Sequence, residues 1–248
     1  MQREENFLVT IVTVSFNSSK TIETTLESVL NQSYRSIQYI IKDGGSTDGT
    51  VAILEKYVPK FKKVGIDFAY ESSPDQGIYD AMNKGIQRAN GSLVGILNSD
   101  DWYEQDTVSK VVDFHFKKPE VDIIYGIVRE ILDDQEFGFR FINDTYLHLE
   151  TINHPGTFIK KESYSKLGLY SLDYKFVSDY DFFLRAKKNG LIFHPIYSVL
   201  CNFRLGGATA KVASQHERTR LLMNYGILRG KNLYSQLARD FLKKMFGG

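Results

Sequence analysis

The segment "LVGILNSDDWY" runs from apolar residues straight into two adjacent aspartates, Asp100 and Asp101. Folding alone gains nothing from paired carboxylates, because they repel each other unless a cation or a bound proton relieves the charge. Carboxylate oxygens are ligands that Mg²⁺ and Mn²⁺ prefer, and such an ion can grip a diphosphate and stabilise it as a leaving group. The pair therefore predicts a metal-assisted site. The alternative is structural, with one aspartate capping a helix that begins near Glu104 and the other in solvent.

The elements that must position these aspartates alternate in type along the first hundred residues. Strand-like apolar segments occupy residues 7–16, 37–43, 66–72 and 92–101, and segments with helical periodicity lie between them. This βαβαβαβ order predicts an α/β fold with an open, mostly parallel sheet flanked by helices on both faces. No repeat, low-complexity stretch or Pro/Gly-rich linker marks a domain boundary within the chain.

Polar side chains follow each predicted strand, where open α/β sheets bind their ligands. They are Ser15 to Asn17, Asp43, Asp75 to Gly77, and Asn98 to Asp101. The first strand is not followed by G-x-G-x-x-G, and "GGSTDGT" lacks the Lys-Ser/Thr of a P-loop, which argues against both of these phosphate-binding motifs. A calcium loop starting at Asp43 would need Glu where Leu54 stands. What remains is a site rich in carboxylates and poor in fixed cations, which a divalent metal ion would complete.

Four motifs resemble those of the inverting family 2 glycosyltransferases of bacterial polysaccharide biosynthesis. They are "TIVTVSFNSSKTIETTLESVLNQSY", "YIIKDGGSTDGT", "SSPDQGIYDAMNKGIQRANGSLVGILNSDDWY" and "SDYDFFLR", in that order. The resemblance implies a single GT-A domain over residues 1–205, with a Rossmann-like half (7–103) that binds the nucleotide sugar and a half (104–205) that binds the acceptor. Residues 206–248 are expected to form a C-terminal lid and a basic amphipathic helical extension. The paired glycines of "RLGGAT" (residues 204–209) permit a hinge, although this segment could also be an ordinary turn.

The resemblance also implies roles for individual residues. It assigns the metal ion, Mn²⁺ or Mg²⁺, to Asp101 with Asp100 assisting. Asn98 stands where many relatives carry Asp, so that position keeps an oxygen but loses a negative charge. The residues that it assigns to the nucleotide sugar, with Asp43 accepting a hydrogen bond from the base, are Ser15, Phe16, Asn17, Asp43, Asn98, Asp100 and His154.

Structural alternatives stay open for several of these residues. Asp43 could instead stabilise the turn that follows it, although Ser46, Thr47 and Asp48 already supply capping oxygens and we favour the base contact. Phe16 could belong to the core rather than lie against a base. His154 could be an ordinary loop histidine with a satisfied hydrogen bond.

The catalytic base is expected in the segment "FVSDYDFFLRAKKNG", whose helical pattern begins near Asp179. The resemblance aligns Ser178 and Asp179 with a Glu-Asp pair, which selects Asp179 to accept the proton of an acceptor hydroxyl. Asp179 and Asp181 are two residues apart and cannot share a helix face, so only one can face the cleft. The alternative is that Ser178 or Asp179 is an N-cap without chemistry.

These features predict an inverting glycosyltransferase that moves a hexosyl or N-acetylhexosaminyl group from a nucleotide-diphosphate sugar, a UDP-sugar, to a hydroxyl of a glycan or lipid-linked saccharide. Two alternatives stay open. A sugar-phosphate nucleotidyltransferase would need a Gly-rich basic loop after the first strand, which "SFNSSK" lacks. An inactive nucleotide-binding module is suggested only by Asn98 and Ser178.

The net charge of +1 hides a basic C-terminus, because residues 204–248 carry nine Lys/Arg and two acids. Within it, four apolar residues recur every fourth position and predict an amphipathic helix: Leu233, Leu237, Phe241 and Met245. Such a helix could contact an anionic membrane surface, or dock on its own domain. With one cysteine, no signal peptide and no apolar span, we expect a cytoplasmic protein, at the inner face of the plasma membrane, and no nucleic-acid partner.

Overall fold

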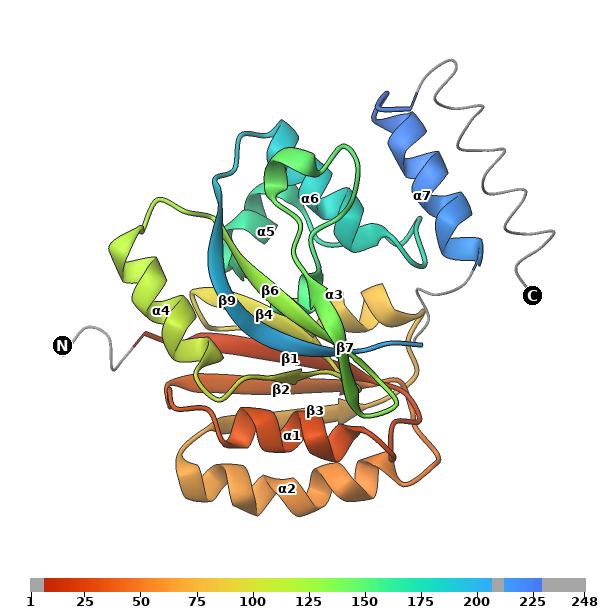
Figure 1. Cartoon of the computed structure of the whole chain (residues 1–248). Helices are drawn as coiled ribbons and strands as arrows, with labels where there is room; N and C mark the ends of the chain where they lie inside the picture. Colours follow the sequence, from red (N-terminus) through yellow and green to blue (C-terminus); the bar gives the residue numbers. More distant parts are fainter. Residues whose placement is uncertain (1–6, 207–211, 229–248) are drawn as a thin grey trace.

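The computed structural model describes residues 7–206 and 212–228 (Figure 1). Its strands are β1 (Val9–Ser15), β2 (Ile37–Asp43), β3 (Asp67–Ser72), β4 (Leu93–Asn98), β5 (Trp102–Tyr103), β6 (Ile123–Leu132), β7 (Gln135–Arg140), β8 (Thr157–Lys160) and β9 (Phe193–Arg204). Its α-helices are α1 (Ile22–Leu30), α2 (Thr50–Val64), α3 (Ile78–Arg88), α4 (Thr107–Lys117), α5 (Lys161–Leu167), α6 (Ser178–Lys188) and α7 (Val212–Asn224). Two 3₁₀ turns are η1 (Asp144–Tyr146) and η2 (His154–Gly156).

The strands of the described residues form one mixed sheet in the order β3-β2-β1-β4-β8-β6-β9-β5, with β7 paired to β6. The first four are parallel, as predicted. Their register sets Ser15 beside Asp43 and Val14 beside Asn98, so the polar strand ends lie next to each other at one edge. All seven residues of β1 are buried because helices cover both faces of the sheet, with α1, α2 and α4 on one and α3, α5 and α6 on the other.

Helix α3 packs unusually close to β1, and a glycine makes this approach possible. A Cβ atom on Gly85 would lie 2.3 Å from Cγ1 of the buried Val12. The helix begins after Gly77, whose φ of 114° lies in a region that side-chain-bearing residues rarely adopt. This helix carries Tyr79 near its start, at the carboxyl edge of the parallel strands.

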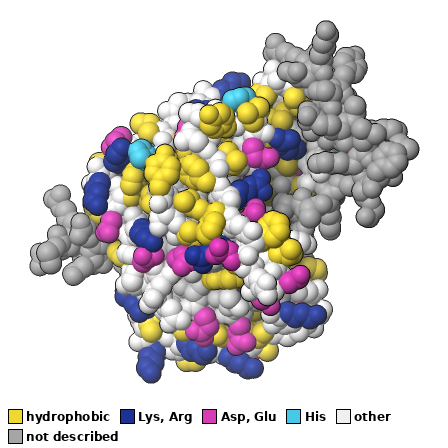
Figure 2. Space-filling view, viewed as in Figure 1, with side chains coloured by type: hydrophobic (Ala, Val, Ile, Leu, Met, Phe, Trp, Pro, Cys, Tyr) yellow, Lys and Arg dark blue, Asp and Glu magenta, His cyan; other side chains and the backbone are white. Residues whose placement is uncertain are grey.

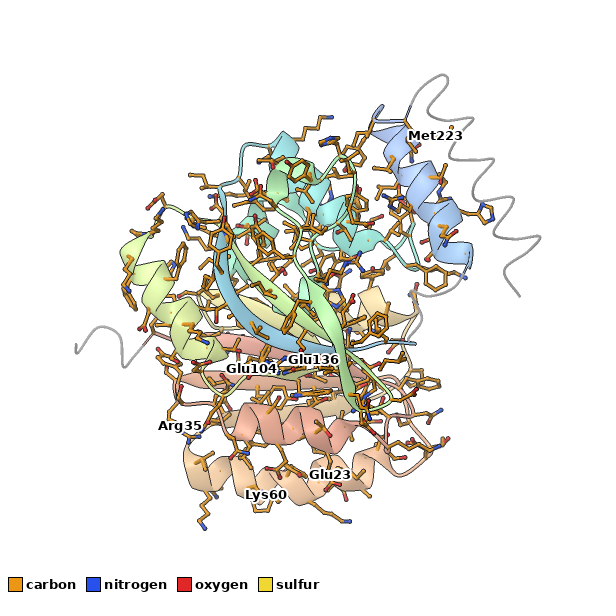
Figure 3. All side chains as sticks on the ribbon, in the orientation of Figure 1. Glu23, Arg35, Lys60, Glu104, Glu136 and Met223 are labelled. Carbon is orange, nitrogen blue, oxygen red and sulfur yellow. The ribbon has the colours of Figure 1, made fainter. Side chains whose placement is uncertain are left out.

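The second half of the sheet curls back over the first. The short strand β5 follows β4 almost immediately, yet it pairs with β9 at the far end of the strand order. Strand β9 must therefore return across the sheet, and Figure 1 shows it curving in front of β1. Arg129 of β6 links this region by ion pairs with Glu104 and Glu136, which Figure 3 labels. The helix expected to begin near Glu104 is α4, which begins at Thr107 with Asp106 at its N-cap position.

Helix α7 packs on the segment that leads into α6. The carboxylate of Glu217 accepts hydrogen bonds from the backbone N–H groups of Lys175 and Phe176, at 2.8 to 3.0 Å. Leu221 and Leu222 are buried in the core on this side. Charged groups of both signs are interspersed with apolar side chains on the face shown in Figure 2.

Part of the predicted C-terminal region lies outside the described residues. This holds for the amphipathic pattern at 233–245 and for residues 207–209 of "RLGGAT". Among the helices that are described, none is long and apolar enough to span a membrane. The proposed division at residues 103 and 205 stays a prediction.

Candidate active site

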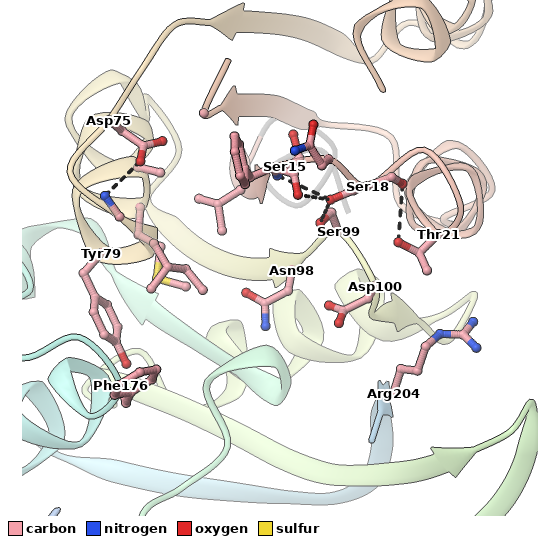
Figure 4. Close-up of a pocket in the computed structure, with 18 of the residues that line it drawn as sticks. Ser15, Ser18, Thr21, Asp75, Tyr79, Asn98, Ser99, Asp100, Phe176 and Arg204 are labelled. Atoms are coloured by element: carbon pink, nitrogen blue, oxygen red, sulfur yellow. Dashed lines mark hydrogen bonds between the residues drawn. The ribbon is translucent and has the colours of Figure 1, made fainter. Parts of the chain in front are cut away.

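A cavity of about 1110 Å³ opens beyond the carboxyl ends of the parallel strands. Figure 4 shows Asn98 and Asp100 pointing into the same space, with Tyr79 and Arg204 on opposite sides. Most of the predicted site residues line this cavity: Ser15, Phe16, Asn17, Asn98, Asp100, His154 and Asp179. Asp43 and Asp101 do not line it and are fully buried behind its wall.

Asp43 holds the turn that follows β2. Its carboxylate accepts hydrogen bonds from the backbone N–H groups of Gly45 and Ser46 and from the hydroxyls of Ser15, Ser46 and Ser72. Burial raises the pKa of Asp43, but the hydrogen bonds from Ser46 and Ser72 outweigh it and lower the pKa below its ordinary value. The structural alternative for this residue is thus confirmed. The base contact stays a prediction, and the five hydrogen bonds already fill the oxygens that would make it.

The end of β1 presents an aromatic ring to the cavity. The side chain of Phe16 is 65% exposed, so the alternative that it belongs to the core is wrong. Asn17 adopts a positive φ of 51°, and its side-chain oxygen accepts a hydrogen bond from the backbone N–H of Thr47 at 2.9 Å. This bond joins the ends of β1 and β2. An exposed ring on an anchored turn is available to lie against a nucleotide base.

The two aspartates after β4 differ in their surroundings. Asp100 faces the cavity, and burial raises its pKa. Asp101 is turned inward, where its two carboxylate oxygens accept hydrogen bonds from Nδ2 of Asn98 and the backbone N–H of Arg204, both at 3.1 Å. Burial, and then the charge of Asp100, raise the pKa of Asp101 well above its ordinary value. Neither aspartate caps a helix, so the structural alternative for the pair is wrong.

Asn98 has a function that a carboxylate could not perform. Its amide donates to Asp101, whereas an aspartate at this position would add a third negative charge beside Asp100 and Asp101. Its amide oxygen lies 3.3 Å from Nε2 of His154. The departure from the family pattern therefore reduces repulsion within the acidic segment.

Asp179 lies at the start of α6 and faces the cavity, as predicted. The hydroxyl of Tyr79 donates to its Oδ1 at 2.8 Å, and Nδ1 of His154 lies 3.3 Å from its Oδ2. Asp181 points elsewhere, to Arg185 at 2.8 Å. The residue at the N-cap is Val177, and no side chain caps the helix, so the capping alternative is wrong.

The expectation of few fixed cations at this site is wrong. Lys20, Lys175 and Arg204 all line the cavity. The guanidinium of Arg204 stacks over Trp102 and pairs with Asp134, and its positive charge lowers the pKa of Asp100 against the effect of burial. The sequence signal was available, since Arg204 is the first residue of "RLGGAT". Tyr79 was also missed, because its position within an amphipathic helix pattern is typical of a core residue.

The residues present fit a metal ion that is held jointly with a nucleotide. Within residues 7–206 and 212–228, no cluster of three or more His, Cys, Asp or Glu side chains could hold a metal ion without other ligands. Mg²⁺ is commonly held by one or two carboxylates together with substrate phosphates. Asp100 on the cavity wall, with Asp101 behind it, supplies this kind of donor set.

Comparisons with known proteins give a consistent result. A family model described as glycosyl transferase family 2 matches residues 10–176. A PGL/p-HBAD biosynthesis glycosyltransferase of Mycobacterium bovis is 28% identical over 220 residues, which cover 88% of this chain and 85% of that protein. The putative teichuronic acid biosynthesis glycosyltransferase TuaG of Bacillus subtilis is 37% identical over 111 residues, covering 45% of this chain and 43% of that protein.

Solved structures agree on the fold. The S. aureus TarS fragment 1–349 in complex with UDP-GlcNAc matches with a TM-score of 0.71 at 16% identity, covering 96% of this chain and 72% of that one. This chain spans 43% of a longer TarS chain. The mannosyltransferase PcManGT of Pyrobaculum calidifontis, in complex with GDP-Man and Mn²⁺, matches with a TM-score of 0.68 at 17% identity, covering 90% of this chain and 65% of that one. The likeness confirms the predicted GT-A fold.

Proposed function

Because the chain belongs to glycosyltransferase family 2, we propose that it transfers a sugar from a UDP-sugar to a hydroxyl of a cell-surface glycan or its lipid-linked precursor, with inversion at the anomeric carbon. The names of the mycobacterial and Bacillus relatives support a glycan or glycolipid acceptor. The TarS complex with UDP-GlcNAc supports a UDP-sugar donor, of the hexosyl or N-acetylhexosaminyl type.

One observation carries this proposal: an acidic strand end and a separate carboxylate line the same cavity. Asp100 comes from the end of β4 and Asp179 from the start of α6. A single displacement needs two such groups, one toward the leaving diphosphate and one toward the attacking hydroxyl.

In the proposed reaction, Asp179 accepts the proton of the acceptor hydroxyl while the oxygen of that hydroxyl attacks the anomeric carbon of the donor sugar. General-base catalysis of this kind contributes roughly 10² to 10⁴ in rate. Phe16 lies against the base of the nucleotide, and Asp43 shapes the turn beneath it. Lys20, Lys175 and Arg204 place positive charge around the cavity, which favours binding of the negatively charged donor.

A divalent ion, Mn²⁺ or Mg²⁺, would be held by Asp100, with Asp101 next to it, and would stabilise negative charge on the departing diphosphate. PcManGT in complex with Mn²⁺ supports this choice. Asn98 orients Asp101 by the hydrogen bond described above. Direct ligation by Asp101 requires its carboxylate to turn away from Asn98 and the backbone of Arg204.

The deciding experiment is a panel of UDP- and GDP-sugars incubated with Mg²⁺ or Mn²⁺, with products identified by mass spectrometry. We expect release of UDP by the wild type and its loss in Asp100→Ala and Asp179→Asn. Asp113→Asn is the matched control, because this side chain is exposed on α4 and does not line the cavity. Pyrophosphate formed from UTP and a sugar phosphate would instead support a nucleotidyltransferase. Nucleotide binding without turnover of any donor would support an inactive module.

We also propose that the protein acts in the cytoplasm, at the inner face of the plasma membrane. The support is the basic sequence of residues 204–248. Polybasic segments bind anionic lipid headgroups with about 1 kcal/mol per Lys or Arg near the surface.

A further inference from the structure

We propose that Tyr79 and His154 are positioning residues that fix the carboxylate of Asp179. His154 contacts this carboxylate with one ring nitrogen and contacts Asn98, on the donor side of the cavity, with the other. This inference rests on the proposed function of Asp179 as the base. Neither residue is predicted to have this role by the motifs of the sequence.

Tyr79 approaches Asp179 from α3. The tyrosine side chain is only 6% exposed, and its hydroxyl donates to Oδ1 of Asp179 at 2.8 Å. Burial, and then the negative charge of Asp179, raise the pKa of Tyr79 well above its ordinary value. The hydroxyl therefore keeps its proton and stays a donor. Its ring packs against Tyr170, with 5.6 Å between ring centroids, so the direction of the hydroxyl is fixed by the core.

His154 approaches the other oxygen from η2. Its Nδ1 lies 3.3 Å from Oδ2 of Asp179, and its Nε2 lies 3.3 Å from Oδ1 of Asn98. Asn98 in turn donates to Asp101. One imidazole ring thus joins the strand end that carries the acidic pair to the helix start that carries the base.

The consequence is that both oxygens of Asp179 have a fixed partner, from two different elements. A carboxylate held at both ends keeps one rotamer, and Asp179, which lines the cavity, still has lone pairs that can accept a further hydrogen bond. Catalytic groups must be held within about 0.5 Å of their productive position, and a misplacement of about 1 Å can cost 10²-fold in rate. Tyr79 and His154 supply this constraint.

Two conservative substitutions of the histidine separate its two contacts. The amide nitrogen of asparagine takes the place of Nδ1, so His154→Asn keeps a donor toward Asp179 and loses the contact with Asn98. The amide nitrogen of glutamine takes the place of Nε2, so His154→Gln keeps the contact with Asn98 and loses the donor toward Asp179. A residue that only fills space would not distinguish these variants.

For the tyrosine, Tyr79→Phe removes only the hydroxyl, and Tyr164→Phe is the matched control. Tyr164 is similarly buried on the same side of the sheet, and its hydroxyl lies 3.5 Å from that of Tyr170. Melting curves establish that each variant is folded. Should Tyr79→Phe fail to fold, the histidine pair decides the question.

The measurements are kcat and KM for the UDP-sugar that the wild type consumes in the donor panel, and UDP binding with Mg²⁺ by calorimetry. We expect Tyr79→Phe and His154→Gln to lower kcat on the order of tenfold or more, with UDP affinity unchanged. His154→Asn should lose less of its kcat than His154→Gln, because it keeps the donor toward Asp179.

The proposal is overturned if His154→Gln is as active as His154→Asn, or if Tyr79→Phe matches Tyr164→Phe in kcat. These outcomes leave the proposed function intact as long as Asp179→Asn abolishes turnover. Full turnover by Asp179→Asn would overturn both the function of Asp179 and this inference.

Discussion

Replacing Gly85 with alanine is expected to destabilise the protein by about 2 kcal/mol, although alanine is the better helix former. Gly85 lies in α3, where an added Cβ atom would stand 2.3 Å from Cγ1, 3.3 Å from Cγ2 and 3.4 Å from Cβ of Val12. Unstrained carbon atoms pack at roughly 3.5 to 4.0 Å. The helix or the strand must therefore move by about 1 Å or more.

Rotation of Val12 cannot relieve this contact. Valine is branched at Cβ and stiff at χ1, and its second methyl group is also closer than an ordinary contact. Overpacking of this kind costs about 1 to 3 kcal/mol, and we take the upper end because Val12 is fully buried. Alanine offsets about 1 kcal/mol through its helix propensity. The net loss of about 2 kcal/mol corresponds to about 4 to 8 °C in Tm for a chain of this size.

Chemical denaturation of a double-mutant cycle tests the magnitude and its cause. Val12→Ala removes the two methyl groups that the new Cβ would meet, so the double variant should be more stable than the sum of the single losses by about 1 kcal/mol or more. Gly138→Ala is the control, because a Cβ atom there meets nothing within 4 Å. Additive losses within about 0.5 kcal/mol, or a Gly85→Ala variant as stable as the wild type, would refute the argument.

Three further predictions concern charged groups. Asp43→Asn should lower the free energy of unfolding by about 1 to 3 kcal/mol at pH 7, measured by urea denaturation. Because the pKa of Asp43 is lowered, its contribution to stability is present above the unfolded pKa of 3.8 and vanishes as the pH falls through the folded pKa. Equal losses at pH 3 and pH 7 would contradict this prediction. Asp101→Asn should raise the free energy of unfolding in EDTA more at pH 8 than at pH 5, because the pKa of Asp101 is raised and its ionised form costs stability as the pH rises. The affinity of the variant for UDP with Mg²⁺, measured by calorimetry, should fall. A gain in the free energy of unfolding that does not depend on pH would disprove the cost of this charge. Deleting residues 229–248 should abolish sedimentation with anionic vesicles without changing donor hydrolysis, and unchanged sedimentation would remove the membrane proposal.

The first half of the fold could be predicted because its signals are local. Four apolar segments alternate with three amphipathic ones, and the β-branched run at β1 is buried along its whole length. Parallel strands bring their carboxyl ends to one edge, so the convergence of Ser15, Asp43 and Asn98 follows from the element order. The site residues that line the cavity were found by the same argument together with the family resemblance.

The second half could not be predicted because its pairing is non-local. The curl that brings β9 beside β5 depends on register shifts near Gly126 and on contacts between residues far apart in the chain. It places the backbone of Arg204 against Asp101 and the guanidinium over Trp102. The sequence therefore indicated an acidic site with few cations, whereas the fold brings the positive charge of Arg204 to this site from about a hundred residues beyond Asp101.

The different burial of Asp100 and Asp101 follows from this same curl. A strand end that met only solvent would leave both carboxylates wet, and their repulsion would be weak. The return of β9 covers Asp101 and leaves Asp100 on the cavity wall, so the buried charge must be compensated by the backbone of Arg204 and the amide of Asn98. The same amide contacts His154, which holds Asp179. Closure of the sheet over β4 and orientation of the proposed base are thus joined by one series of polar contacts, and a change at either end should affect the other.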